Sequence, residues 1–283
     1  MNYSDNTTFL DYAKSLIQQL KYKTVLVKYG GAAMKDEKLT IQMVKNLIFL
    51  NDLGLRCIVV HGGGPNINDW LQKFSIKPQF KNGIRITDSI TMEIVQMVLA
   101  GQVNKTLVTI FNKYNGNAVG LSGHDSNLII ADPIDKQDNN RVANVGSIDL
   151  RIINLLINNN YIPIIAPIGV SKQGLSYNIN ADLVAGALAE KLKVDVLIIL
   201  TDTPGILKDH QNKATLYENL TPMEVCKLIE DGIIFGGMLP KVKSCLHALD
   251  NGVKVVKIID GRIDNSLILS FIENTQVGTS ILY

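Results

Sequence analysis

The sequence predicts an α/β fold, a three-layer sandwich in which helices cover both faces of a mainly parallel open sheet. Short runs of aliphatic and β-branched residues alternate along the chain with longer segments whose apolar residues recur every three or four positions. The short runs show no polar–apolar alternation, which is typical of strands buried on both faces. With 283 residues, 46% of them hydrophobic and 19% charged, the chain is long enough to bury such a core.

The first part of the chain is predicted to begin with an amphipathic helix. Its apolar residues at helical spacing are Phe9, Leu10, Ala13, Leu16, Ile17 and Leu20. The elements that follow are a strand at 24–28, a helix at 39–52, a strand at 56–61, a helix at 66–74, a loop or hairpin at 79–87 turning at Gly83, a helix at 89–114, strands at 118–121 and 128–130, a hairpin tip at 135–141, a helix at 150–160 and a strand at 162–166.

A loop at 167–174 is expected to separate two lobes, residues 1–170 and residues 171–283. The second lobe is predicted to contain helices at 181–192, 221–231, 238–251 and 266–272, and strands at 194–200, 253–259 and 278–282. The helix at 221–231 has the signature of a capping box, with Thr221 before it, Pro222 first and Glu224 third.

Composition and charge exclude several classes of protein. A net charge of +2 without a clustered basic face argues against a nucleic-acid partner. No apolar run reaches the roughly 20 residues that a membrane span needs, and residues 1–8 do not resemble a targeting peptide. Cys57, Cys226 and Cys245 lack paired spacing, so we expect small core residues in a reducing compartment rather than a disulfide or zinc site.

Two glycine turns after predicted strands suggest a phosphate site. The segment Arg56–Pro65 runs from a strand into the glycines Gly62–Gly64, after which Pro65 can open a helix. Glycines at such a turn leave backbone N–H groups free to face a cavity, and the helix N-terminus adds partial positive charge. Upstream, Lys28 ends a strand beside the pair Gly30–Gly31, and a fixed ammonium next to backbone donors suits a transferring phosphoryl group.

Two interpretations limit this site. His61, a single histidine before the three glycines, is interpreted as a hydrogen-bonded structural residue rather than a base. The chain contains neither the P-loop motif nor the glycine fingerprint of dinucleotide-binding folds, so the two commonest nucleotide folds are excluded.

A second group of polar residues suits a carboxylate ligand. Arg85 follows a glycine turn and can clamp a carboxylate with two hydrogen bonds, although a surface pair with Asp88 is equally open. In the segment Asn178–Asp182, alternation places Asn178 and Asn180 on one side of an extended stretch and Asp182 in the first turn of the next helix. Capping explains Asn180 or Asp182, but not all three residues.

Two later segments are candidates for a nucleotide site. Thr201–Leu207 follows a strongly apolar strand, and ligands of open α/β sheets bind beyond the carboxyl ends of strands. Gly236–Lys241 places a lysine in the first turn of a helix, where it opposes the helix dipole unless a polyanion lies between them. The assembled set fits a kinase whose acceptor is a carboxylate, which is nucleophilic without a base.

Six segments together resemble the amino acid kinase family over essentially the whole chain. They are Lys28–Met34, His61–Pro65, Asn82–Asp88, Asn178–Asp182, Gly237–Lys241 and Ile258–Arg262. Within the family, the set is similar to that of members that phosphorylate N-acetyl-L-glutamate, and Pro78–Gly83 resembles the cyanobacterial and plastid-encoded branch.

The resemblance implies that ATP, with Mg²⁺ carried by the nucleotide, phosphorylates the γ-carboxylate of N-acetyl-L-glutamate to N-acetyl-L-glutamyl 5-phosphate in arginine biosynthesis. Lys28 and Lys241 would stabilise the transition state, and Asp182 would orient both lysines. The substrate-binding residues would be Gly63, Gly64, Arg85 and Asn178. The residues implied for the phosphates and the nucleotide are Gly30, Gly31, Thr201, Asp202, Gly205, Ile206, Leu207, Gly237 and Met238. The first lobe would bind the amino acid and the second would bind ATP.

The resemblance also implies partners and a location. The leading helix is similar to that of hexameric members, built as a trimer of dimers, with a dimer as the alternative; some of these members bind the PII signalling protein and are inhibited by arginine. Their arginine site has a histidine and a glutamate where this chain has Lys257 and Ser270, and a glycine is common where it has Gln276. We therefore expect arginine inhibition to be weakened relative to those members. A plastid-encoded protein of the chloroplast stroma is favoured over a bacterial cytoplasmic one.

Other functions remain open at this point. Aspartate or carbamate are alternative acceptors within the family, although aspartate kinases usually carry appended regulatory domains. A non-catalytic amino-acid sensor is a different class of answer, but a sensor would need neither the two lysines nor Asp182. A dinucleotide-dependent oxidoreductase lacks support because the fingerprint is absent.

Overall fold

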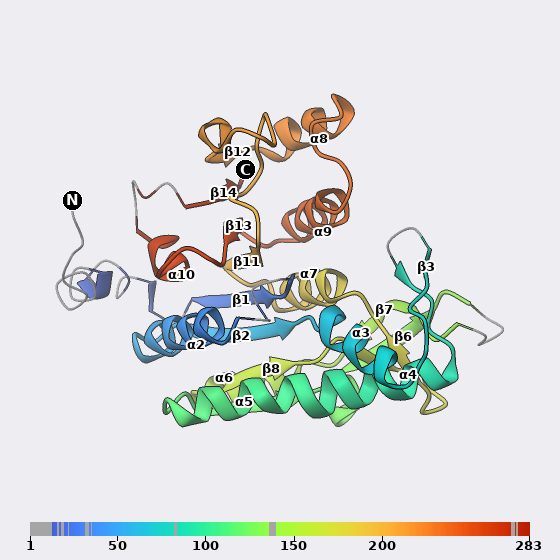
Figure 1. Ribbon diagram of the computed structural model, residues 1–283. Coiled ribbons are helices and arrows are strands. Elements are labelled where there is room, and N and C mark those ends of the chain that lie inside the picture. Colours follow the sequence, from blue (N-terminus) through green and yellow to red (C-terminus); the bar gives the residue numbers. More distant parts are fainter. Residues whose placement is uncertain are drawn as a thin grey trace.

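The computed structural model describes residues 13–283 except positions 16, 18, 19, 22, 32, 33, 35, 82, 83, 136–139, 273, 274 and 276. Its centre is an eight-stranded sheet in the order β12-β14-β13-β11-β1-β2-β8-β5 (Figure 1). In chain order these strands are β1 (Thr24–Tyr29), β2 (Arg56–His61), β5 (Ala118–Leu121), β8 (Ile162–Ile165), β11 (Val196–Thr201), β12 (Asn219–Leu220), β13 (Val255–Asp260) and β14 (Thr279–Ile281). Neighbouring strands are parallel except β13 and β14, which confirms the open, mainly parallel sheet.

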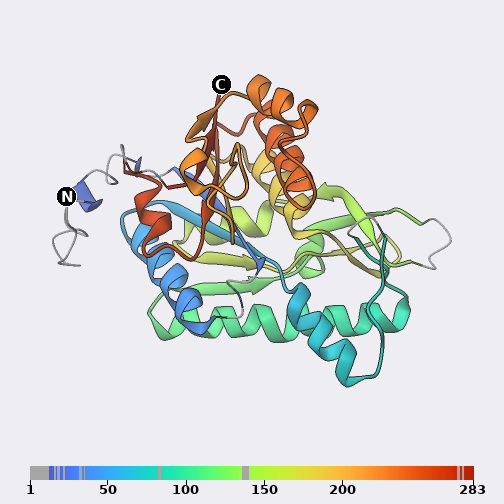
Figure 2. The ribbon, with the colours of Figure 1, turned by 45° about the horizontal axis from the view of Figure 1, so that its top comes forward.

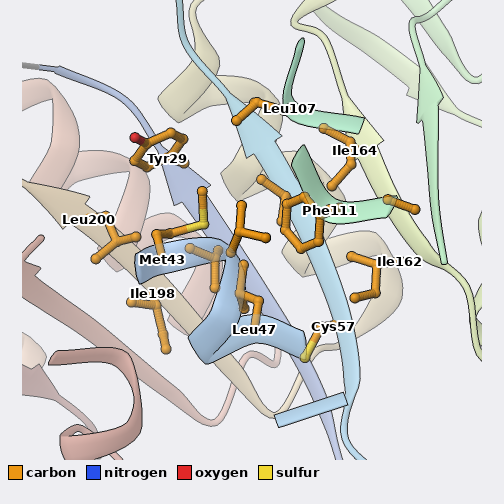
Figure 3. Packing of buried hydrophobic residues seen from close by; sticks show 14 of the residues in the cluster. Tyr29, Met43, Leu47, Cys57, Leu107, Phe111, Ile162, Ile164, Ile198 and Leu200 are labelled. Atoms are coloured by element: carbon orange, nitrogen blue, oxygen red, sulfur yellow. The ribbon is translucent and has the colours of Figure 1, made fainter. Parts of the chain in front are cut away.

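Helices cover both faces of this sheet, because successive side chains of a strand point to opposite faces. Val25 and Val27 of β1 pack into one core and Leu26 packs into the other. The first core is closed by α2 (Glu37–Asp52), α3 (Gly64–Lys73), α4 (Ser89–Gln96), α5 (Asn104–Lys113) and α10 (Ser266–Leu269); the second by α6 (Arg151–Asn158), α7 (Ala181–Leu192), α8 (Pro222–Glu230) and α9 (Met238–Asp250). Figure 3 shows Met43 of α2 and Phe111 of α5 in the first core, near β1 and β2.

A four-stranded sheet lies beyond the carboxyl ends of β1 and β2, beside the hairpin of β3 (Phe80–Lys81) and β4 (Ile84–Arg85) (Figure 2). Its strands are β6 (Ile129–Pro133), β7 (Ala143–Ile148), β9 (Ile168–Val170) and β10 (Ser176–Asn178), in the order β10-β9-β6-β7. The expected loop at 167–174 is therefore wrong in its first half, and β7 was not predicted. The β3–β4 hairpin is confirmed, while Gly83 at its turn lies outside the described residues.

These small strands explain why the sequence-based assignment failed here. β7 (Ala-Asn-Val-Gly-Ser-Ile) is half exposed and has few apolar residues, so its pairing with β6 defines it rather than its hydrophobic pattern. β9 and β10 form an antiparallel pair across the expected lobe boundary at residue 170.

One continuous helix runs from Ser89 to Lys113, as predicted, and contains α4, a π-helical segment η3 (Met97–Val103) and α5. Among the described residues, this helix is the one that is long and apolar enough to cross a membrane. Buried helices in the cores of soluble proteins often have the same length and composition. Its apolar side packs in the first core.

The remaining helix predictions are largely confirmed. α8 begins with the predicted capping box, in which the Thr221 side chain and the Glu224 side chain satisfy each other's backbone N–H. α10 ends earlier than predicted, at Leu269. Most of the predicted leading helix lies outside the described residues; positions 13–15 and 17 are helical, and Ala13 and Ile17 are buried.

Candidate functional site

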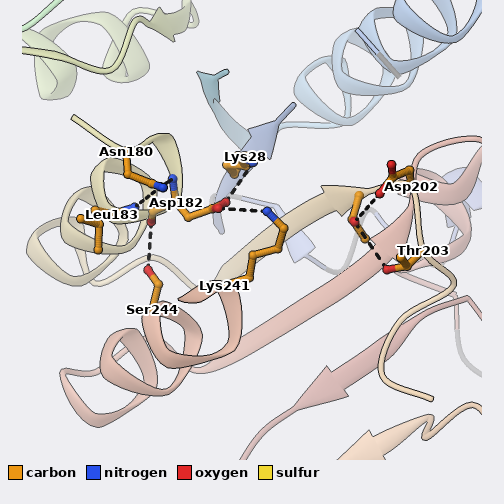
Figure 4. A network of polar contacts seen from close by, with 9 residues as sticks. Lys28, Asn180, Asp182, Leu183, Asp202, Thr203, Lys241 and Ser244 are labelled. Atoms are coloured by element: carbon orange, nitrogen blue, oxygen red, sulfur yellow. Dashed lines mark hydrogen bonds and ion pairs between the residues drawn. The ribbon is translucent and has the colours of Figure 1, made fainter. Parts of the chain in front are cut away.

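Three charged side chains from separate elements meet at the carboxyl end of β1 (Figure 4). Asp182 of α7 lies between two lysines: its Oδ1 is 2.9 Å from Nζ of Lys28 on β1, and its Oδ2 is 3.0 Å from Nζ of Lys241 on α9. Lys28 and Asp182 are buried, and the Lys241 side chain is 25% exposed. Two ammonium groups that share one carboxylate leave one net positive charge at the end of the sheet.

Local structure fixes the central carboxylate. The Asn180 side chain accepts hydrogen bonds from the N–H groups of Asp182 and Leu183, so Asn180 is the N-cap of α7. The Ser244 hydroxyl of α9 donates to the backbone oxygen of Asp182 at 2.9 Å, which ties the two helices together at this point. Gly186 permits this close approach, because a Cβ there would lie 2.5 Å from the Ser244 hydroxyl. Asn180 is thus a structural cap, whereas Asp182 faces the two lysines.

The pKa values of the central pair reflect burial and mutual attraction. Burial lowers the pKa of Lys28 below its ordinary 10.5, opposed by the attraction of Asp182 and, more weakly, of Asp202. Burial by itself would raise the pKa of Asp182, but the two lysines outweigh it, so the carboxyl remains ionised well below its ordinary 3.8. The Asp182 carboxyl is therefore ionised at neutral pH, and its charge opposes the effect of burial on Lys28.

The two glycine turns touch each other beside the lysines. A Cβ on Gly62 would lie 3.5 Å from Cα of Gly30, and a Cβ on Gly30 would lie 2.9 Å from Nζ of Lys28. Gly31 adopts a φ of +77°, which favours glycine, and the space beyond it is open. At the start of α3, the N–H groups of Gly63 and Gly64 have no hydrogen-bond partner among the described residues. The predicted cluster of backbone donors next to an ammonium is present.

Arg85 is buried and lies next to the second glycine turn. One nitrogen, Nη2, donates to the side-chain oxygen of Asn68 at 2.6 Å and lies 3.4 Å from the backbone oxygen of Gly64; the guanidinium also lies 4.8 Å from the ring centre of Phe80. The other nitrogen, Nη1, is buried and has no hydrogen-bond partner among the described residues. Asp88 caps α4 instead of pairing with Arg85, so the alternative of a surface Arg–Asp pair is wrong. An unpaired buried donor suits an anionic ligand.

Asn178 of β10 lies near the segment that follows Arg85. Its amide nitrogen is 3.3 Å from the hydroxyl oxygen of Thr87, which follows β4. The sequence had not indicated Thr87, nor Asn66 and Asn68 in the first two turns of α3. Asn66 carries a buried side-chain oxygen that lacks a partner among the described residues. Two asparagines directly after a Gly-Gly-Gly-Pro turn were the signal that could have identified them.

The candidate nucleotide residues divide into two groups. Thr201 ends β11 next to Asp202, and the space beyond Gly237, before Met238 at the start of α9, is open. By contrast, the side chains of Ile206 and Leu207 are buried. Gly205, with a φ of +141°, packs against Thr279, whose hydroxyl accepts from the Ile206 N–H at 2.8 Å. The side chains of this second group pack inside the protein, and the backbone N–H and carbonyl of Ile206 are already hydrogen-bonded to Thr279 and Tyr217.

The other sequence-based interpretations can be tested in the same way. His61 is fully buried and hydrogen-bonded, as expected of a structural residue. Cys57 and Cys245 are buried core residues, and burial raises the pKa of the Cys57 thiol to about 12. Cys226 is exposed, so its assignment to the core was wrong, because it lies on the outer face of the short helix α8. The described residues contain no group of three or more His, Cys, Asp or Glu side chains that could hold a metal ion.

Comparison with known proteins agrees with this geometry. Residues 23–260 match the model of the amino acid kinase family. The chain is 47% identical to an acetylglutamate kinase of Nostoc punctiforme over 96% of this chain and 92% of that protein, and 47% identical to one of Porphyra purpurea over 95% of each. The crystal structure of smu.665 from Streptococcus mutans superposes with a TM-score of 0.76 at 30% identity, over 92% of this chain and 98% of that one. The chain therefore belongs to the amino acid kinase family and is a phosphotransferase.

Proposed function

We propose that this protein transfers the γ-phosphoryl group of ATP to the γ-carboxylate of N-acetyl-L-glutamate in L-arginine biosynthesis. The observation that carries the proposal is the ion-pair cluster of Lys28, Asp182 and Lys241 beside two glycine turns. The curated relatives, nearly half identical over almost the whole chain, support the choice of acceptor.

In this proposal the lysines neutralise the charge of the transferring group. Lys28 and Lys241 lie on either side of one carboxylate, so their ammonium groups are held in place before substrate arrives, without reorganisation during the reaction. Asp182 orients both lysines, and its charge opposes the lowering of the Lys28 pKa by burial. Backbone N–H groups of Gly31 and Gly63 donate to the phosphoryl oxygens, beside Gly30. The acceptor carboxylate needs no base, since it is ionised at neutral pH.

The amino-acid substrate is proposed to bind at the N-terminus of α3, the helix that begins at the glycine turn. Arg85 offers its unpaired Nη1 to a carboxylate of the substrate, and Gly64 and Asn178 supply further hydrogen bonds. The nucleotide is proposed to bind over Thr201, Asp202, Gly205, Ile206 and Leu207 and over Gly237 and Met238, where the carboxyl end of β11 meets the start of α9. ATP supplies the phosphoryl group, and Mg²⁺ bound to its phosphates offsets their charge.

The acceptor is tested by measuring ADP release from Mg-ATP with N-acetyl-L-glutamate, glutamate, aspartate and carbamate, in the wild type and in Arg85→Lys. We expect turnover with N-acetyl-L-glutamate alone. Arg85→Lys should raise KM for that acceptor by about tenfold to a hundredfold and leave KM for ATP near its wild-type value, because a lysine cannot replace the two-pronged guanidinium.

Two results would contradict this assignment. Turnover with aspartate or carbamate would keep the kinase mechanism and change the acceptor. Nucleotide binding without turnover on any acceptor would favour the amino-acid sensor. Lys77→Arg serves as the matched control, since it exchanges one cation for another on the loop before the β3–β4 hairpin.

Arginine inhibition is proposed to be weak. The Lys257 ammonium donates to the backbone oxygen of Ser270 at the end of α10 and lies 5.9 Å from the ring centre of Phe271. A cation would thus replace the histidine of the arginine-inhibited members and a serine their glutamate, while Gln276 is outside the described residues. Millimolar arginine should lower activity by less than about twofold, because the charge-assisted hydrogen bonds of a carboxylate are lost. The double variant Lys257→His, Ser270→Glu is expected to be inhibited more strongly; strong, saturable inhibition of the wild type would contradict the proposal.

The organisation of the chain completes the proposal. Residues 1–170 would form the lobe for the amino acid and residues 171–283 the lobe for ATP. The leading helix would join dimers into a hexamer, with a dimer as the alternative, and the PII signalling protein is a candidate partner. Red-algal and cyanobacterial relatives are consistent with either a chloroplast stroma or a bacterial cytoplasm, and we favour the stroma.

A further inference from the structure

We propose that His61 and Asn104 are positioning residues that hold the peptide between Gly62 and Gly63 in one orientation, and so aim the Gly63 N–H at the reacting phosphoryl group. The proposal rests on the proposed function for the identity of that group. It does not rest on it for the orientation of the peptide, which can be measured without substrate.

The two hydrogen bonds of His61 determine which ring nitrogen carries the proton. Its Nδ1 is 2.7 Å from the backbone oxygen of Gly62, and its Nε2 is 3.2 Å from the amide nitrogen of Asn104. A carbonyl oxygen can only accept, so Nδ1 carries the proton and Nε2 accepts from the Asn104 amide. Burial lowers the pKa of His61 to about 4, which agrees with a neutral ring. One tautomer therefore satisfies both contacts.

Asn104 anchors the ring to the end of the sheet. Its side-chain nitrogen also lies 2.8 Å from the backbone oxygen of Ile164 on β8 and 3.4 Å from that of Leu121 on β5. Gly120 makes room for the amide, since a Cβ there would lie 2.0 Å from the Asn104 oxygen. Three neighbouring strands, β2, β8 and β5, are thus tied to one amide, which leaves the imidazole little freedom to rotate.

The π-helical segment places this amide. Asn104 is the first residue after η3, so the wider turn of η3 sets the direction in which its side chain leaves the helix. Leu99 of the same segment lies against the glycine turn, because a Cβ on Gly63 would lie 2.4 Å from its Cδ2. The long helix therefore contacts Gly63 directly through Leu99 and indirectly through Asn104 and His61.

Fixing the Gly62 carbonyl also fixes the Gly63 N–H. The two groups belong to one planar trans peptide and point in opposite directions. On its other side, Gly62 donates its own N–H to the backbone oxygen of Tyr29 at 2.7 Å. Gly62 is thus held at its N–H by β1 and at its carbonyl by His61, whereas the Gly63 N–H has no partner among the described residues. Without these contacts the dihedral angles of the glycines could vary widely, and the peptide between Gly62 and Gly63 could rotate.

The test compares two conservative variants that differ in the contact they keep. The side-chain amide of asparagine can occupy the place of Nδ1, so His61→Asn keeps a donor for the Gly62 carbonyl. The amide of glutamine reaches the place of Nε2, so His61→Gln keeps the partner of Asn104 and loses that donor. We expect kcat of His61→Gln to be about 10- to 100-fold below that of His61→Asn, with equal KM for ATP, since a misaimed donor affects the transition state.

A merely structural histidine predicts a different result. Both variants would then lose activity in proportion to their unfolded fraction, measured by circular dichroism, and would have equal kcat per folded molecule. Equal kcat values, or a lower kcat for His61→Asn, would overturn the proposal.

A substrate-free measurement separates this proposal from the proposed function. The ¹H–¹⁵N heteronuclear NOE of the Gly63 amide should be lower in His61→Gln than in the wild type and in His61→Asn. Without the hydrogen bond from residue 61 to the Gly62 carbonyl, the Gly63 N–H bond has more motion on the picosecond-to-nanosecond timescale that this NOE reports. A protein that fails to phosphorylate N-acetyl-L-glutamate but shows this NOE pattern would refute the acceptor and support the positioning. An unchanged Gly63 NOE in His61→Gln would refute the positioning, whatever the acceptor.

Discussion

Replacing Lys28 by methionine is expected to lower kcat about 10²- to 10³-fold while the protein stays folded and still binds ATP. Methionine has a similar length and suits the buried end of β1, but it removes one of two ammonium groups held against Asp182 before the reaction begins. A preorganised charge of this kind acts on the transition state, so the loss is expected in kcat rather than in KM.

The measurement is steady-state ADP release at saturating Mg-ATP and acceptor, together with ATP binding by calorimetry. Lys254→Met is the matched control: Lys254 makes a 2.6 Å ion pair with Asp195 at an exposed position outside the site. It is expected to retain wild-type kcat, because exposed ion pairs contribute little. A Lys28→Met protein that is folded and keeps kcat within threefold or so of the wild type would refute the two-lysine mechanism.

Asp182→Asn should change both stability and the pH dependence of activity. Asparagine has the same shape but leaves two neighbouring ammonium groups without their shared anion. Breaking a buried ion pair from one side typically costs about 3–5 kcal/mol of unfolding free energy. The variant also removes the attraction that opposes the lowering of the Lys28 pKa by burial, so that pKa should fall further.

The direction of each pH effect follows from these shifts. In the wild type the folded-state pKa of Asp182 lies below its ordinary 3.8, so its stabilising contribution is present above that pH and is lost as the pH falls through the folded-state value. The stability difference between wild type and Asp182→Asn should therefore be full at pH 7 and disappear in strong acid. The alkaline fall of kcat should begin below pH 10.5 in the wild type and at a still lower pH in the variant.

Urea denaturation at pH 7 and at acid pH, and a kcat profile from pH 6 to 10, measure both effects. Asp149→Asn is the control, since Asp149 pairs with Arg151 on the surface and should alter neither property. Equal alkaline limbs in wild type and Asp182→Asn would show that the charge of Lys28 does not depend on Asp182.

Most of the sheet and its helices could be predicted from the sequence, because the relevant signals are local. β-branched runs mark β1, β2, β8 and β11, and helical spacing of apolar residues marks the long helix from Ser89 to Lys113. The glycine turns could be recognised because glycine has no side chain and adopts conformations that other residues avoid. The start of α8 could be recognised because Thr221 is a residue type that caps helices. Lys28 stood out as a lysine beside a glycine pair, and Lys241 as a cation in the first turn of a helix, where it opposes the dipole. Asp182 stood out because helix capping could not explain all three polar residues of Asn178–Asp182.

The tertiary structure decided which of these groups meet. Asp182 contacts a lysine 59 positions away on α9 and another on β1, and no local pattern specifies such distances along the chain. Arg85 pairs with Asn68 and not with the nearby Asp88, because the start of α4 already uses that carboxylate. β7 and β9 are strands through their pairing with β6, and Asn104, directly after the π-helical segment of the long helix, contacts His61 on β2. Local periodicity and turn chemistry thus determined the elements, while packing of elements distant in sequence determined the site.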